Sequence, residues 1–483
     1  MRWPPRCSGL ASFGRGRSLR RPVDVVPSSD CPRIVARSDA SDGGGWCPTC
    51  EDCCVPTGRE RQAEIFFGGA IGQRARVPFD AKRLEQRAQS SMTAEAFAYV
   101  AGAAGEEATM RANRRAFERI AIVPRMVRDV SVRDATVELF GRRLPAPVLL
   151  APIGVLELAH PEGDIAAARA AASVGVPTIF SSQASCPMEK VAAVMGDAPR
   201  WFQLYWSTRD DLVASFVGRA ERCGCEAIVI TLDTTLLGWR TRDLELAYLP
   251  FLRGLGIAQY TSDPIFGKIV RERGRAHSSQ RPTLAGLRTL RQLHRNVRGL
   301  DPRAAVQTFT EIYSRPSLRW DDLLRIRDLT SLPVLLKGIL HPDDARRALD
   351  AGFDGIIVSN HGGRQLDGAV ASLDALPPII EVVGNRIPVL LDSGIRSGSD
   401  ILKALALGAT AVLLGRPYVY GLAIAGEAGV REILLNLIAD FDLALGLSGC
   451  TALGDLKEAT LAMGAERTWR EEQEEHGHRD RTA

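Results

Sequence analysis

The chain has 483 residues, of which 45% are hydrophobic and 24% charged, and its 61 Lys and Arg against 57 Asp and Glu give a formal net charge of +4. This composition is typical of a folded globular protein and excludes a wholly disordered or fibrous chain. A charge so close to balance gives no reason to expect a nucleic-acid partner. No apolar run reaches the roughly 18 residues that a transmembrane helix needs, so no transmembrane segment is expected either.

The two ends of the chain differ from its middle. Residues 1–60 are rich in Arg, Gly, Pro, Ser and Cys without helical or strand periodicity, and we expect a disordered leader here and a disordered polar tail at 465–483. An Arg-rich transit peptide is the alternative for the leader. The spacing of Cys47, Cys50 and Cys53 would suit zinc, but no second Cys or His pair follows at finger spacing, so we predict no metal site. The scarcity of cysteine elsewhere is typical of a cytoplasmic protein.

From about residue 147 the sequence alternates short apolar runs with segments of helical period. The apolar runs begin at residues 147, 176, 201, 227, 333, 354, 388 and 411. Near-continuous apolar strands, each followed by a helix, predict a parallel sheet covered by helices. Eight such units predict a closed (β/α)8 TIM barrel within residues 61–464. An open doubly wound sheet is the alternative, but no G-x-G-x-x-G follows the first strand.

One interval between strands is much longer than the others. It separates the fourth run, at 227–233, from the fifth, at 333–338. We therefore expect a lid insertion at about 241–319, placed to cover the mouth of the barrel. Catalytic groups of TIM barrels lie at the carboxyl ends of the strands, so the functional residues should follow the apolar runs.

The ends of the seventh and eighth strands predict a phosphate site. The segments 392-DSGIRSGSD-400 and 414-LGRP-417 place glycines, together with Arg396 and Arg416, where helices are expected to begin. Backbone N–H groups at a helix start bind anions, and barrels frequently bind phosphate after strands 7 and 8. Two tight turns with surface arginines are the alternative.

The segment 359-SNHGGRQLD-367 follows the sixth strand. His361 offers a base that titrates near neutral pH, and Arg364 offers a bidentate clamp for a carboxylate. Side chains at the ends of three other strands are expected to converge on the same mouth: Tyr205, Arg240 and Lys337. Two arginines, a histidine and a tyrosine suit a small anionic hydroxy acid as substrate.

These motifs resemble those of the FMN-dependent α-hydroxy-acid oxidases and dehydrogenases. The family signature S-N-H-G-x-R-Q occupies residues 359–365, and the resemblance extends over about residues 62–458. It includes 99-YVAGAAGEE-107 and 230-ITLDTTLLGWRTRDL-244. The stretch 238–266, with its long insertion, looks most similar to lactate 2-monooxygenase.

The resemblance implies FMN as the cofactor and assigns residues to it. Those that would contact the flavin ring, the ribityl chain or the phosphate are Pro152, Ile153, Gly154, Ser181, Gln203, Thr231, Lys337, Ser359, Asp392, Ser393, Gly394, Ile395, Arg396, Gly415 and Arg416. The charge of Lys337 would stabilise the anionic reduced ring.

The resemblance also implies the catalytic and substrate-binding residues. His361 would be the general base, and Asp233 would orient its imidazole and stabilise the cation. The residues that would bind the carboxylate or the hydroxyl of the substrate are Tyr99, Tyr205, Arg240 and Arg364. Whether His361 accepts the hydroxyl proton during hydride transfer or the α-proton to form a carbanion stays open.

The activity implied is oxidation of a small (S)-2-hydroxy acid, with L-lactate and O2 as the expected substrates. In a monooxygenase the lid would retain pyruvate beside hydrogen peroxide, giving acetate, carbon dioxide and water. An oxidase would release the 2-oxo acid and hydrogen peroxide, and a dehydrogenase would use another acceptor. The resemblance further implies a homo-oligomer, either tetramer or octamer. Other nucleotide-binding barrels share the phosphate site but have no need of His361, Arg364 and Arg240.

Overall fold

The structure of the chain is a computed structural model, and it describes residues 55–274, 284–458 and 460–463. The expected leader, up to residue 54 and with all of its cysteines, lies outside the described residues. The expected tail at 465–483 also lies outside them. The described residues form a barrel and the helices and short sheets that pack around it.

Eight parallel strands close into a barrel in the order β10-β11-β4-β5-β6-β7-β8-β9. In chain order they are β4 (Val148–Leu150), β5 (Thr178–Ser181), β6 (Arg200–Tyr205), β7 (Ile228–Thr231), β8 (Val334–Ile339), β9 (Gly355–Val358), β10 (Val389–Leu391) and β11 (Ala411–Leu414). Each strand falls within one of the predicted apolar runs or its immediate border, and the predicted (β/α)8 TIM barrel is confirmed.

Apolar side chains fill the barrel interior toward the amino ends of the strands. This inner core includes Leu149, Ile179, Trp201, Val229, Leu335, Ile357, Leu390 and Leu413. The antiparallel hairpin of β2 (Val137–Leu139) and β3 (Arg142–Leu144) packs against it, and the rings of Phe140 and Trp201 lie 5.6 Å apart. Because this end is closed by apolar packing, a polar site has room only at the carboxyl ends of the strands.

Helices cover the outside of the barrel. Those that follow strands are α5 (Gly163–Ala172), α6 (Met188–Ala193), α7 (Asp210–Arg222), α14 (Pro342–Asp350), α15 (Ser372–Val383), α16 (Gly398–Ala406) and α17 (Arg416–Leu447). Three short 3-10 turns come directly after β4, β9 and α17: η1 (Leu156–Leu158), η4 (His361–Gly363) and η5 (Leu453–Glu458). Local sequence fixes their starts. His341 caps α14 by accepting a hydrogen bond from Asp343 N–H, and Pro342 supplies the first helical residue.

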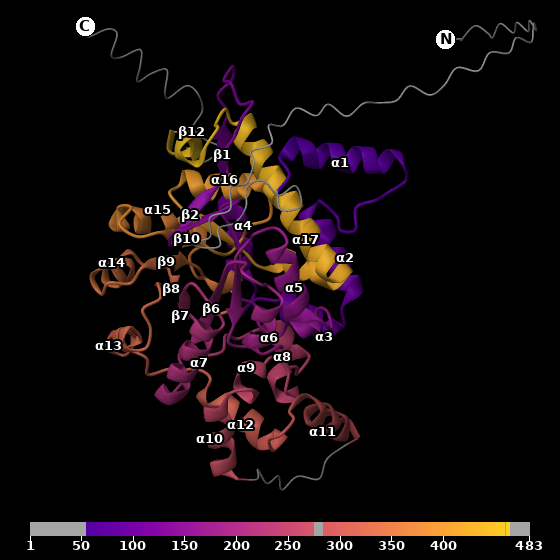
Figure 1. Cartoon of the computed structure of the whole chain (residues 1–483), viewed down its shortest axis with the longest axis vertical. Helices are drawn as coiled ribbons and strands as arrows, with labels where there is room; N and C mark the ends of the chain where they lie inside the picture. Colours follow the sequence, from indigo (N-terminus) through magenta and orange to yellow (C-terminus); the bar gives the residue numbers. More distant parts are fainter. Residues whose placement is uncertain (1–54, 275–283, 459, 464–483) are drawn as a thin grey trace, which may run out of the picture. The chain divides into compact units, whose positions relative to one another are not determined.

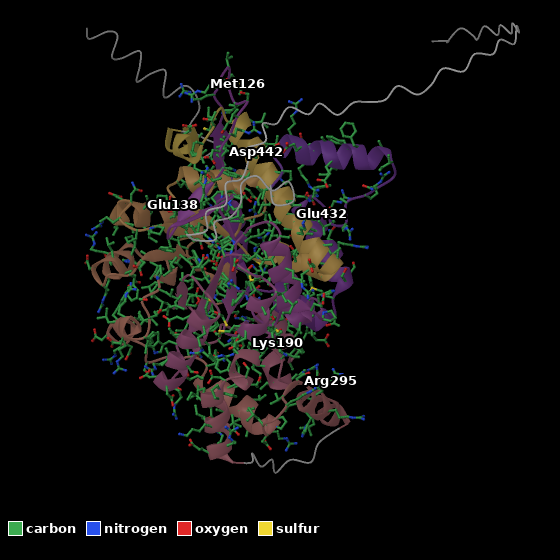
Figure 2. All side chains as sticks on the ribbon, in the orientation of Figure 1. Met126, Glu138, Lys190, Arg295, Glu432 and Asp442 are labelled. Carbon is green, nitrogen blue, oxygen red and sulfur yellow. The ribbon has the colours of Figure 1, made fainter. Side chains whose placement is uncertain are left out.

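Four helices precede the barrel: α1 (Gly58–Ala70), α2 (Ala81–Ser91), α3 (Ala94–Ala101) and α4 (Ala108–Glu118). The first begins within the residues assigned to the leader, and Gly58 N–H donates to the carboxylate of Asp442 on α17 at 2.8 Å. Asp442, labelled in Figure 2, also pairs with Arg133 at 2.6 Å. A two-stranded sheet joins β1 (Ile120–Val123) to β12 (Thr460–Met463) near the end of the described chain.

The long segment between β7 and β8 folds mainly as helices. It contains α8 (Thr241–Glu245), η2 (Pro250–Arg253), α9 (Ala258–Thr261), α10 (Pro264–Arg273), α11 (Leu284–Asn296), α12 (Pro302–Ile312), α13 (Trp320–Leu324) and η3 (Arg325–Asp328). Figure 1 shows α8 to α12 gathered at one end of the barrel. Arg219 of α7 anchors this insertion, because its buried guanidinium contacts Asp263 at 3.2 Å and donates to Gln259 O at 2.7 Å. No helix in the described ranges is long and apolar enough to cross a bilayer.

Candidate active site

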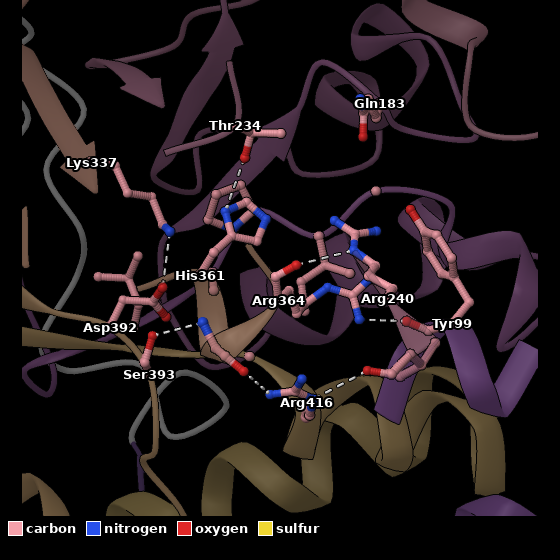
Figure 3. A pocket seen from close by; sticks show the side chains of 18 of the residues that line it. Tyr99, Gln183, Thr234, Arg240, Lys337, His361, Arg364, Asp392, Ser393 and Arg416 are labelled. Atoms are coloured by element: carbon pink, nitrogen blue, oxygen red, sulfur yellow. Dashed lines mark hydrogen bonds and ion pairs between the residues drawn. The ribbon is translucent and has the colours of Figure 1, made fainter. Parts of the chain in front are cut away.

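A cavity opens at the carboxyl ends of the strands, and Figure 3 shows the side chains around it. The sequence-predicted residues that line it are Tyr99, Pro152, Ile153, Gly154, Tyr205, Arg240, Lys337, His361, Arg364, Asp392, Ser393, Gly394, Ile395, Arg396, Gly415 and Arg416. The other predicted residues lie just behind its wall: Ser181, Gln203, Thr231, Asp233 and Ser359. The structure therefore brings the candidate residues together from all eight strand ends.

His361 and Asp233 form a hydrogen-bonded pair. His361 Nδ1 lies 2.7 Å from Asp233 Oδ1, and the hydroxyl of Thr234 donates to the same oxygen at 2.9 Å. Since a carboxylate only accepts, Nδ1 carries the proton and Nε2 is left as a base. Burial lowers the pKa of His361, although the charge of Asp233 opposes this. The imidazole is therefore neutral at neutral pH and able to accept a proton.

Two guanidiniums lie beside this pair, and among the described residues the charge of Asp243 acts on both without forming an ion pair. Arg364 donates to Tyr99 O at 2.5 Å and to Gly102 O at 2.9 Å, and Arg240 donates to Gln365 Oε1 at 3.1 Å. Neither forms an ion pair with any of the residues that the structure describes. Burial and the neighbouring charge of Arg240 lower the pKa of Arg364 to about 9. Two such cations, crowded together in a cavity, form a site for an anion.

A lysine network forms the other wall near His361. Lys337 Nζ lies 2.9 Å from Asp392 Oδ2 and donates to Ser359 Oγ at 2.8 Å, as Figure 3 shows for the ion pair. Burial by itself would lower the pKa of Lys337, but the charges of Asp392 and Asp233 outweigh it and the pKa is raised. Lys337 thus stays a cation at the edge of the cavity.

The loop after β10 and the start of α17 form the predicted phosphate site. Arg396 is partly buried, and burial together with the nearby Arg416 and Arg114 lowers its pKa to about 10. The guanidinium of Arg416 donates to three backbone carbonyls, those of Val100, Gly362 and Gly102. Within the described residues, neither Arg396 nor Arg416 pairs with an acid. An anion here would meet Arg396 and the backbone N–H groups that begin α17.

Buried polar atoms without partners test whether FMN fits. Gln203 Nε2 and Thr231 Oγ1 have no hydrogen-bond partner in the described part of the chain, although both are buried behind the cavity. Ser181 Oγ lies 3.2 Å from Gln203 Oε1 and holds that amide in place. Gly154 lines the cavity without a side chain, and a Cβ at this position would come within 2.8 Å of the backbone oxygen of Gln183. Unpartnered polar groups on one wall, beside a glycine without a side chain, fit a flat polar ring such as the flavin of FMN, with its phosphate at the far end of the cavity.

Several residues of the cavity were not predicted. Gln183 and Thr234 line it, and each stands within two residues of a predicted position, Ser181 or Asp233. Phe251 and Tyr313 also line it and come from the long insertion. No local pattern distinguishes these two aromatics from the core residues of the same segment.

The comparisons with known proteins agree with this geometry. The family described as FMN-dependent dehydrogenase matches residues 88–463 of the chain. The chain belongs to this family. The predicted resemblance is thereby confirmed, and FMN is the cofactor that the family uses.

Relatives within the family act on 2-hydroxy acids. An L-lactate oxidase of Lysinibacillus sphaericus is 41% identical over 392 residues, covering 81% of this chain and 94% of that protein. A 4-hydroxymandelate oxidase of Amycolatopsis orientalis is 41% identical over 381 residues, covering 79% and 97%. A solved structure of mandelate oxidase with (S)-4-hydroxymandelic acid superposes with a TM-score of 0.68 at 39% identity, covering 80% and 99%. The protein is an FMN-dependent α-hydroxy-acid oxidoreductase.

Proposed function

We propose that this enzyme oxidises L-lactate with O2 and releases acetate, carbon dioxide and water. The observation that carries the proposal is the pairing of His361 with Asp233 beside two guanidiniums that form no ion pair with any of the described residues. A base and an anion clamp facing one cavity are what a 2-hydroxy acid requires. The names of the relatives support a hydroxy acid as substrate, and lactate is one of their substrates.

In this proposal Arg240 and Arg364 bind the carboxylate of the substrate. Tyr99 and Tyr205 complete the clamp, because both line the same cavity and Arg364 lies 5.1 Å above the ring of Tyr99. Phe251 packs edge-on to Tyr99 with ring centroids 6.4 Å apart and leaves an apolar wall for the substrate side chain. A methyl group suits a wall of this kind.

In this proposal His361 is the group that accepts the proton from the substrate. Lys337, Arg396 and the start of α17 would hold FMN, which would supply the two-electron acceptor. His361 Nε2 accepts the hydroxyl proton if the α-hydrogen leaves as hydride, or the α-proton if a carbanion forms. In both cases Asp233 stabilises the imidazolium that results, because its carboxylate is already hydrogen-bonded to Nδ1.

The insertion supports the monooxygenase outcome. Lactate and O2 give pyruvate and hydrogen peroxide, and these two give acetate, carbon dioxide and water if pyruvate stays in the cavity. Phe251 and Tyr313 reach the cavity from the insertion and are joined through Phe309, at 5.1 Å and 5.2 Å between ring centroids. Aromatic packing of this kind would slow the departure of pyruvate. The oxidase, which releases both products, is the second candidate, because two of the relatives are named L-lactate oxidase.

A homo-oligomer is part of the proposal. Phe66 and Phe67 of α1 are 73% and 75% exposed, and Ile71 directly after the helix is 76% exposed. Large apolar side chains gathered on one helix favour burial against another copy of the chain. Analytical ultracentrifugation of the holoenzyme should give a tetramer or an octamer, and a monomer at micromolar concentration would refute this.

Product analysis tests the proposed reaction. The purified holoenzyme is supplied with L-lactate in air, and acetate, pyruvate and hydrogen peroxide are measured together. We expect acetate without free peroxide. Equal amounts of pyruvate and peroxide would establish the oxidase instead, and turnover of mandelate but not lactate would move the proposal to aromatic hydroxy acids.

A further inference from the structure

The backbone that carries His361 is held in an unfavourable conformation. His361, Gly362 and Gly363 are consecutive left-handed residues with φ of 58°, 67° and 77°. Glycine adopts this conformation at little cost, but for histidine it is unfavourable and persists only where surrounding contacts impose it. The conformation turns the imidazole toward Asp233, so whatever imposes it also aligns the base.

Asn360 supplies one of these contacts. Its side-chain oxygen accepts from Gly363 N–H at 3.1 Å, and its side-chain nitrogen donates to Val370 O at 3.0 Å. The amide of Asn360 thus ties together the two ends of the loop that contains His361. Asn360 itself is only 5% exposed, so its orientation depends on a buried partner.

That partner is Asn113 of α4, far away in the sequence. Asn113 Nδ2 donates to Asn360 Oδ1 at 2.9 Å, and Asn360 Nδ2 donates to Asn113 Oδ1 at 2.7 Å. Asn113 Oδ1 also accepts from Ser372 N–H at 3.1 Å. The two amides form a reciprocal pair in which each group has a partner, and Asn113 is 2% exposed.

The start of α4 is hydrogen-bonded to the second half of the loop that contains His361. Thr109 N–H and Glu106 N–H both donate to the carboxylate of Asp367, at 2.9 Å and 2.8 Å. Ala104 N–H donates to Gly363 O at 2.9 Å. The helix and the residues just before it therefore hold the loop at two points, and Asn113 is directly joined to the residue before His361.

We propose that Asn113 is a positioning residue, which aligns His361 for proton transfer by fixing the amide of Asn360. The proposal rests on the proposed role of His361 as base. Asn113 is not among the residues lining the cavity, and its side chain bonds Asn360 and Ser372, so in this proposal it acts through Asn360 and not by contact with the substrate. Its loss should slow the chemical step while leaving the carboxylate clamp and the FMN site in place.

The test uses Asn113→Asp and Asn113→Ala in the holoenzyme. The aspartate has the shape of asparagine but cannot donate to Asn360 Oδ1. We expect anaerobic flavin reduction at saturating L-lactate to be about 10- to 100-fold slower, as a base displaced by a fraction of an ångström predicts. The FMN content should stay within about threefold of the wild-type value. The Kd of oxalate, a dicarboxylate whose binding involves no proton transfer to His361, should do the same. Arg115→Gly is the matched control, because Arg115 is an exposed residue of the same helix, so the change weakens α4 through helix propensity and should leave the rate unchanged.

A cycle with Asn360→Ala separates positioning from general stability. If Asn113 acts only through Asn360, then adding Asn113→Ala to Asn360→Ala should not slow flavin reduction further. Additive losses in the double variant would overturn the proposal. Loss of bound FMN or of folded protein in Asn113→Asp would also overturn it, because Asn113 would then be needed only for folding. A normal rate in Asn113→Asp with a slow His361→Ala would refute this inference but not the proposed function. A normal rate in His361→Ala would refute the proposed function itself.

Discussion

The imidazole of His361 lies 2.7 Å from the carboxylate of Asp233, although the two residues follow different strands, β9 and β7. The carboxylate orients the ring and leaves Nε2 facing the cavity. Burial lowers the pKa of His361, and Asp233 is the group that limits this shift. The pair therefore sets both the direction and the basicity of the proposed base.

Removal of the carboxylate should change the pH dependence of the reaction. In Asp233→Asn the charge that raises the pKa of His361 is lost, so the acid limb of flavin reduction moves to lower pH. The plateau rate should fall by about 10²-fold because the imidazolium is no longer stabilised. Stopped-flow rates between pH 5 and 9 measure both effects. An acid limb that moves to higher pH would contradict the assignment, and Thr234→Val serves as a milder control on the same oxygen.

Substitution in the carboxylate clamp should affect substrate binding more than cofactor binding. Arg364→Lys keeps one charge but loses the planar fork, and KM for L-lactate should rise at least about tenfold. FMN content should not change, because the residues proposed for the phosphate lie elsewhere in the cavity. Steady-state kinetics and the absorbance of bound flavin check the two statements. A variant with normal KM and lost flavin would place Arg364 in the FMN site instead.

Lys337 and Asp392 should depend on one another. Lys337→Met leaves the carboxylate of Asp392 buried without its cation, which costs about 3 to 5 kcal/mol of stability. The double variant Lys337→Met/Asp392→Asn removes both charges and should recover much of that loss. Flavin reduction should remain slow in both variants, since each lacks the positive charge proposed to stabilise the reduced ring. Thermal unfolding of the double variant at the same temperature as the single one would argue against the pairing.

Asp164 should make the protein less stable as the pH rises. Burial raises the pKa of this carboxyl to about 7, so the folded state holds a proton that the unfolded chain releases above about pH 4. The free energy of unfolding then decreases as the pH rises from about 4 to 7, by up to about 4 kcal/mol. In Asp164→Asn this contribution is absent, and Tm should depend less on pH between 5 and 8. An unchanged pH dependence in the variant would show that Asp164 ionises normally.

The barrel and most of the site were predictable because their signals are local. Each strand is a short apolar run, and the residues that follow it, such as Lys337 after the apolar start of β8, must lie at the same end of the sheet. Asn113 and Tyr313 could not be predicted in this way. Asn113 belongs to a helix outside the barrel, and its role depends on a contact with Asn360 that only the tertiary fold creates.

The direction in which a long side chain points could also not be predicted from the sequence. The position of Arg416 at the start of α17 indicated a phosphate contact, and the residue does line the cavity. Its guanidinium, however, is hydrogen-bonded to Val100, Gly362 and Gly102 carbonyls, which joins separate segments of the mouth. A sequence pattern places a residue at a strand end but does not show which of several acceptors a long side chain will reach.

Anaerobic flavin reduction by L-lactate in His361→Ala tests the central claim most directly. The variant should bind FMN like the wild type, because His361 is not needed to hold the cofactor. Its flavin should be reduced at least about 10²-fold more slowly, as expected for loss of a general base. Reduction at a rate close to that of the wild type would contradict the role of His361, because the proton would then be accepted by another group.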